Sequence, residues 1–84
     1  MISLAICSND PERLYGTYEA AVLFSLETET ELEIYRFNDA EEYMNTETAF
    51  DAVITDDNKL LDSVGNACSI GNCQELFRSF LKRS

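Results

Sequence analysis

Short apolar runs that end in polar residues alternate along this chain with stretches of helical periodicity. Apolar residues dominate 2–7 and 50–55, and the runs stop at Ser8-Asn9-Asp10 and at Asp56-Asp57. A nearly continuous apolar run is typical of a strand that is buried on both faces. The two stretches therefore predict central strands that bring their polar tips to one shared edge of a sheet.

Helical spacing follows the first strand and returns at the end of the chain. Asp10 is suited to cap a helix and Pro11 to begin it, so we expect a helix over 11–27. Its predicted inward face has apolar residues three and four positions apart. These residues are Leu14, Tyr15, Tyr18, Ala21, Val22 and Leu26. A last helix is expected over 73–82, with an inward face of Cys73, Leu76, Phe77, Phe80 and Leu81.

Shorter elements fill the space between these helices. Residues 32–37 are rich in strand formers and suit an edge strand, and residues 67–70 are a candidate fourth strand. Asn38 and Asp39 should cap a short helix that reaches residue 44, and one or two helical turns after residue 57 should close at Gly65. Strands that alternate with helices over short connections predict an α/β domain with a parallel sheet and helices on both faces. We expect residues 1–84 to form this single domain.

The charge of the chain narrows its range of partners. Sixteen acidic residues against six basic ones give a net charge of −10. This charge repels phosphate backbones and anionic lipid headgroups, so composition argues against nucleic acid and membrane partners. No apolar run approaches the roughly 20 residues of a membrane span, and the first residues do not resemble a signal peptide. We therefore expect a cytoplasmic protein.

The cysteines Cys7, Cys68 and Cys73 are odd in number, and the chain has no histidine. Without a fourth cysteine or a histidine, a zinc site is not expected. In a cytoplasmic protein the three should be reduced thiols that fill small apolar spaces. The sequence leaves a disulfide between Cys68 and Cys73 open.

The order of these elements, with Asp10-Pro11 after the first strand and Asp56 at the tip of the third, resembles the receiver domain of bacterial response regulators. The similarity is to the receivers that precede LytTR-type DNA-binding domains, and it is good over 1–57 and weaker beyond. It implies a flavodoxin-like sheet of about four strands in the order 2-1-3-4. The chain is shorter than an ordinary receiver by about one strand and helix between Gly65 and the last helix.

The resemblance also implies chemistry that can be checked residue by residue. Asp56 stands at the position of the phospho-acceptor, but Ser8 and Asn9 replace the paired carboxylates that bind Mg²⁺ in the family. A hard cation prefers charged oxygens, so only weak Mg²⁺ binding is expected, at Asp10, Asp56 and Asp57, and no resident cofactor. The switch Ser or Thr of the family has no counterpart, and its Lys falls on Gly71.

Three functions remain open from the sequence. The first is a degenerate receiver-like domain that signals by protein contact, with a histidine kinase or a regulator as its partner, and is not an enzyme. The second is an active switch that accepts a phosphoryl group on Asp56. The third is a small phosphatase, because Cys7 and Arg13 have the Cys-x5-Arg spacing of a phosphate-binding loop. Pro11 and the acidic residues in this loop oppose that last interpretation.

The absence of one strand and helix, relative to an ordinary receiver, predicts a homodimer. Removal of one strand and helix should leave the edge at 67–70 unprotected, and that stretch carries neither charge nor proline. The basic residues Arg78, Lys82 and Arg83 lie on the last helix and could face an acidic neighbour. We expect pairing through this C-terminal strand and helix, with Ile70 and Phe80 in the interface.

Overall fold

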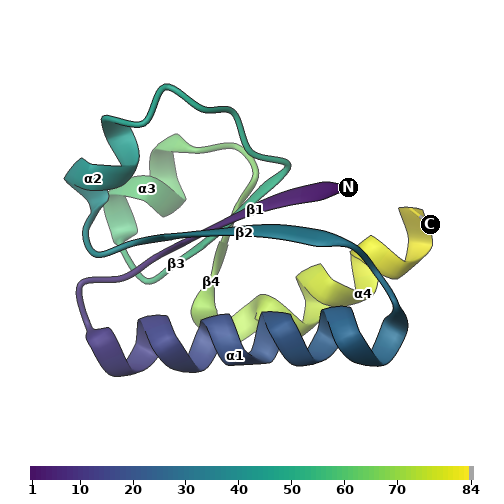
Figure 1. The fold of residues 1–84 in the computed structure, drawn as a ribbon. Helices are drawn as coiled ribbons and strands as arrows, with labels where there is room; N and C mark the ends of the chain where they lie inside the picture. The colour runs from purple at the N-terminus through teal and green to yellow at the C-terminus, as the bar shows by residue number, and fades with distance from the viewer. Residues whose placement is uncertain (84) are drawn as a thin grey trace.

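The computed structural model describes residues 1–83, and the side chain of Arg83 lies outside the described part. Strands and helices alternate from one end to the other (Figure 1). In chain order the elements are β1 (Ile2–Cys7), α1 (Pro11–Thr28), β2 (Leu32–Phe37), α2 (Ala40–Met44), β3 (Ala52–Thr55), α3 (Asn58–Ser63), β4 (Ala67–Ser69), a 3₁₀ turn (Ile70–Asn72) and α4 (Cys73–Arg83).

The four strands form one sheet in the order β2-β1-β3-β4, and every pair is parallel. This confirms the predicted α/β class and the strand order 2-1-3-4, and the arrangement is consistent with a flavodoxin-like fold. β1 and β3 are the two central strands, as their apolar runs predicted. Residues 4–7 and 52–55 are buried at every position, because helices cover both faces of the sheet.

Each face of the sheet has its own apolar core. On one face Leu4, Ile6 and Ile54 pack with residues of α1 and α4, and the ring of Phe24 stacks on that of Phe77 with centroids 4.9 Å apart. On the other face Ala5, Cys7 and Val53 pack with Leu60 of α3 and with a cluster of aromatic rings. α1 and α4 run along one side in Figure 1, and α2 and α3 lie on the opposite side. The rings of the second cluster are Tyr35, Phe37, Tyr43 and Phe50.

Three of the described helices that begin at the carboxyl edge of the sheet, α1, α2 and α3, have an aspartate as N-cap. The Asp10 carboxylate accepts a hydrogen bond from the amide of Glu12 (3.0 Å), and the Asp39 carboxylate accepts one from Glu42 (2.7 Å). Asp57 accepts from the first amides of α3. A carboxylate at a helix N-terminus satisfies orphan amides and is favoured by the helix dipole. The predicted caps at Asp10 and Asp39 are confirmed.

The inward faces of the two long helices differ in part from the prediction. Tyr15 and Leu26 of α1 are 57% and 71% exposed, whereas Thr17 is buried beside Leu14 and Ala21. The face of α1 that contacts the sheet carries Leu14, Thr17 and Ala21. Because α1 also has apolar residues on its other faces, periodicity alone predicted a different inward face.

The C-terminal part of the chain also differs from the prediction. Leu81 of α4 is 45% exposed, and Ile70 belongs to the 3₁₀ turn and not to β4. α3 ends at Ser63 with Val64 as an extended C-cap, so Gly65 does not close it. Phe80 is fully buried in the core under α1 and α4, and therefore cannot be an interface residue.

Loss of burial in the central strands should cost more than loss of a helix cap. Ile54 is 0% exposed, so Ile54→Ala should lower the free energy of unfolding by about 2–4 kcal/mol through lost burial and a residual cavity. Asp10→Ala should cost about 1 kcal/mol, the usual loss for an N-cap. Urea denaturation of both variants measures the difference. A larger cost for Asp10→Ala would contradict the central position of β3.

Candidate functional site

The pairing of β1 with β3 brings two polar residues together at the carboxyl edge of the sheet. Cys7 pairs with Thr55 in the parallel register, and the next residues along the two strands are Ser8 and Asp56. The Ser8 hydroxyl, which is 1% exposed, donates a hydrogen bond to Oδ2 of Asp56 at 3.0 Å. The same hydroxyl accepts one from the amide of Asp10 at 3.1 Å. One buried serine thus joins the tip of β3 to the loop that begins α1.

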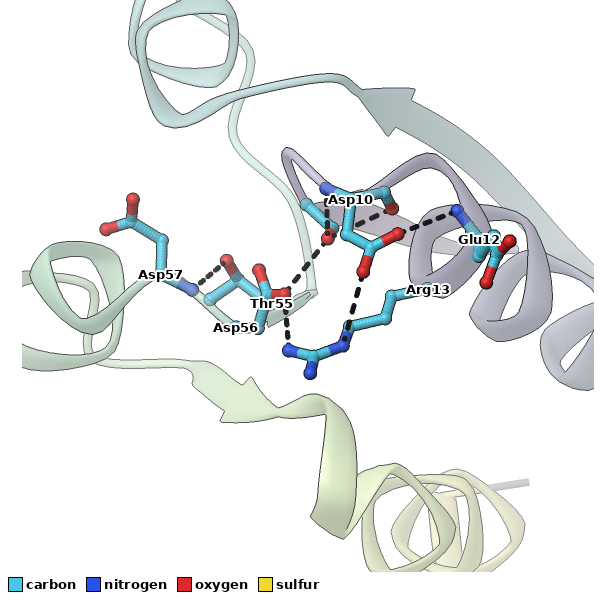
Figure 2. A network of polar contacts seen from close by, with 7 residues as sticks. Asp10, Glu12, Arg13, Thr55, Asp56 and Asp57 are labelled. Carbon is cyan, nitrogen blue, oxygen red and sulfur yellow. Dashed lines mark hydrogen bonds and ion pairs between the residues drawn. The ribbon is translucent and has the colours of Figure 1, made fainter.

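Arg13, on the first turn of α1, contacts the same carboxylate. Its terminal nitrogen lies 3.3 Å from Oδ2 of Asp56, and its Nε lies 3.6 Å from Oδ2 of Asp10. Figure 2 shows the guanidinium between these two carboxylates. Because the Arg13 side chain is 64% exposed, the ion pair should contribute about 1 kcal/mol or less to stability and should weaken as salt rises.

The three carboxylates predicted as weak metal ligands do not meet at a common point. Asp10 caps α1 and pairs with Arg13, and Asp56 binds Ser8 and Arg13. Asp57 uses Oδ1 to cap α3, and its carboxylate points away from the Arg13 guanidinium in Figure 2. Within residues 1–83, no group of three or more Asp, Glu, Cys or His side chains is arranged to hold a metal ion. This donor set, with a cation already on Asp56, does not fit the Mg²⁺ that the family resemblance implies.

A cleft of about 330 Å³ opens at this edge of the sheet. It is lined by residues 7–9, 39–40 and 56–58 and by Arg13. Its described lining therefore contains three aspartates and one arginine. The ends of β1 and β3 and the starts of α2 and α3 contribute to it, which is the place where open α/β sheets keep their sites.

Cys7 reaches this cleft as a buried thiol. Burial raises the pKa of Cys7 to about 11, a hydrogen bond with Thr55 opposes the shift, and the carboxylates of Asp57, Asp39 and Asp56 add to it. The thiolate is the nucleophilic form of cysteine, and a pKa this high keeps Cys7 protonated at neutral pH. Catalytic thiols need the opposite environment, so the site chemistry disfavours the Cys-x5-Arg phosphatase.

The loop itself is also unsuited to a phosphate. The Asp10 carboxylate already accepts from the Glu12 amide, and Pro11 has no amide hydrogen to offer. Arg13 points to Asp56 instead of completing a phosphate cradle. An anion would have to displace the Asp10 carboxylate before it met the Glu12 amide.

The sequence singled out Asp10, Asp56 and Asp57, but it missed the role of Ser8 and a second link at the opposite end of the strands. There the Asp51 carboxylate accepts from both the amide (2.8 Å) and the hydroxyl of Ser3. The two serine–aspartate pairs have the same sequence offset, 48 residues, which is recognisable only once the strand register is known. It reflects the constant register of β1 against β3.

Comparison of the chain with models of known protein families, with curated proteins and with solved structures found no match. None of the described helices is both long enough and apolar enough to cross a membrane.

Cys7 should react slowly with thiol reagents while the protein is folded. A pKa near 11 leaves about a hundredfold less thiolate than an ordinary cysteine has near pH 8. We expect a correspondingly slow reaction with Ellman's reagent in a Cys68→Ser/Cys73→Ser variant, with a rate that rises until the pH approaches this pKa. Denaturant should restore fast labelling, and Cys7→Ser serves as the blank. Rapid labelling in the folded state would contradict the buried thiol.

Proposed function

We propose that this chain is a shortened, degenerate receiver-like domain that acts in signalling by protein contact, without phosphotransfer. The observation that carries the proposal is the engagement of Asp56 by Ser8 and Arg13 at the carboxyl edge of a 2-1-3-4 parallel sheet. A phospho-acceptor needs an accessible carboxylate oxygen and a metal to neutralise the incoming phosphoryl group. In this site a hydroxyl and a guanidinium are bound to Oδ2 of that carboxylate.

A function by contact is supported by the outer surface of α1. Tyr15, Leu23 and Leu26 are each more than half exposed, and their spacing places them along one stripe of the helix. Aligned apolar side chains on a helix surface are typical of a protein-binding face. The partner proposed here is a protein, such as a histidine kinase or another regulator, in the cytoplasm. The net charge of −10 argues against nucleic acid.

Self-association is proposed through the other edge of the molecule. β4 lies at the end of the strand order, and its three residues Ala67–Ser69 are partly exposed and uncharged. Such an edge offers backbone groups for pairing with a second copy. Ile70 is half-buried next to it, and Leu81 is exposed on α4. Closed two-fold pairing would cover this surface.

The proposal predicts that Asp56 does not take up a phosphoryl group. After incubation with acetyl phosphate and Mg²⁺, intact-mass measurement of the wild type should show no adduct. Asp56→Asn is the matched control, since it removes the acceptor and keeps the shape. An adduct on the wild type that disappears in Asp56→Asn would establish the active switch instead.

The same preparation tests the phosphatase. We expect no turnover of p-nitrophenyl phosphate beyond the level of Cys7→Ser. Turnover that this substitution abolishes would overturn the proposal in favour of the enzyme.

The dimer prediction concerns β4 and α4. Sedimentation equilibrium at tens of micromolar protein and physiological salt should show a wild-type dimer. Leu81→Glu should weaken the dimer at least tenfold, because it puts a charge on an exposed position of the proposed face. Leu26→Glu, an equally exposed change on α1, is the control and should leave the dimer intact.

Ile70→Lys provides a second test of this face, with a thermal melt to check that the variant is folded. A wild-type monomer would rule out the proposed dimer. A dimer that survives both Leu81→Glu and Ile70→Lys would place the interface elsewhere.

A further inference from the structure

We propose that Arg13 is a built-in counter-ion, so that the chain itself supplies the cation which a receiver-like site takes from solution. The inference deepens the proposed function and rests on it, because it concerns the regulation of the same site. It predicts that the wild-type site does not respond to divalent cations and that loss of Arg13 creates such a response.

The position of the guanidinium supports this assignment. Asp10 belongs to the loop after β1 and Asp56 to the end of β3, and Arg13 contacts both carboxylates. A single cationic side chain thereby contacts the tips of both central strands. Figure 2 shows these contacts converging on the one guanidinium.

Burial explains why a cation is needed there. The Asp56 side chain is only 19% exposed, and a carboxylate withdrawn from water needs a charged or hydrogen-bonding partner. Asp39 and Asp57 line the same cleft and add negative charge, whereas Arg13 is the one basic residue in the described lining. The guanidinium offsets this charge, and it would repel a metal ion that approached Asp56.

The presence of Arg13 also suggests how regulation could differ from that of a phospho-accepting switch. A metal ion or a phosphoryl group is added and removed reversibly, whereas Arg13 is a permanent part of the chain. The charge at the strand tips is therefore balanced by the chain itself at any concentration of divalent cation. A protein partner would meet a surface whose charge does not depend on metal.

The test uses Mn²⁺ as the probe and broadening of backbone amide signals as the readout. In the wild type, millimolar Mn²⁺ should not selectively broaden the amides of Ser8, Asp56 and their neighbours. In Arg13→Gln these signals should broaden, with Mn²⁺ binding about tenfold tighter or more, because removal of one nearby positive charge strengthens cation attraction. Adding Asp56→Asn to Arg13→Gln should abolish the effect.

Two matched variants separate this site from the general acidity of the protein. Arg78→Gln changes the net charge by the same amount on an exposed position of α4, and it should behave as the wild type. Arg13→Lys keeps the positive charge and should bind less Mn²⁺ than Arg13→Gln. Amide signals far from the cleft report that each variant is folded.

Equal local broadening in the wild type and Arg13→Gln would overturn the inference, and so would its absence from Arg13→Gln. Equal effects in Arg78→Gln and Arg13→Gln would overturn it as well, since the response would then follow net charge. Failure of the inference would be distinguishable from failure of the proposed function. The function fails only if the wild type accepts phosphoryl groups or turns over a phosphate ester, whatever its response to Mn²⁺.

Discussion

The parallel register between β1 and β3 decides which side chains meet at the carboxyl edge of the sheet. Both strands are buried on both faces over residues 4–7 and 52–55, so a slip by one residue would move every apolar side chain to the opposite core. The register is therefore strongly held. With Cys7 opposite Thr55, Ser8 and Asp56 become neighbours, and the Ser8 hydroxyl can satisfy the carboxylate. The cleft, its charge and the position of α1 all follow from this pairing.

The two contacts of Asp56 differ in what they contribute to the site. The Arg13 pair is mostly solvated and contributes little to stability, whereas the bond from Ser8 to Asp56 is partly buried and comes from a hydroxyl that is itself buried. Removal of this hydroxyl should cost free energy, because the carboxylate would lose a hydrogen-bond partner in a place with little water. Ser8 therefore fixes the geometry, and Arg13 balances the charge. Where the family resemblance implies a metal-binding carboxylate, this chain has a hydroxyl donor that needs no metal.

Much of the fold follows from the sequence, and less of the site does. Apolar runs at 2–7 and 50–55 identified the central strands because burial on both faces leaves no polar alternation. Asp10-Pro11 marked the start of α1, because an N-cap hydrogen bond and the fixed backbone angle of proline depend only on neighbouring residues. The inward face of α1 was partly wrong, since Tyr15 and Leu26 share the helix with Thr17 and Ala21, and only packing decides which stripe fits the sheet. The contacts of Ser8 and Arg13 with Asp56 depend on a register across 48 residues, which no local pattern encodes.

The central position of β1 has a consequence for how the chain folds. β1 is synthesised before the other three strands of the sheet, yet its partners are β2 and β3, and its register with β3 joins residues 48 positions apart. Non-local parallel pairing is slow, because loop closure must be completed before any contact repays it. β1 can pair with β2 once residue 37 has been synthesised, but its other edge stays unpaired until β3 follows at residues 52–55. We expect folding to be all-or-none and late, with exposure of residues 2–7 as its most vulnerable moment.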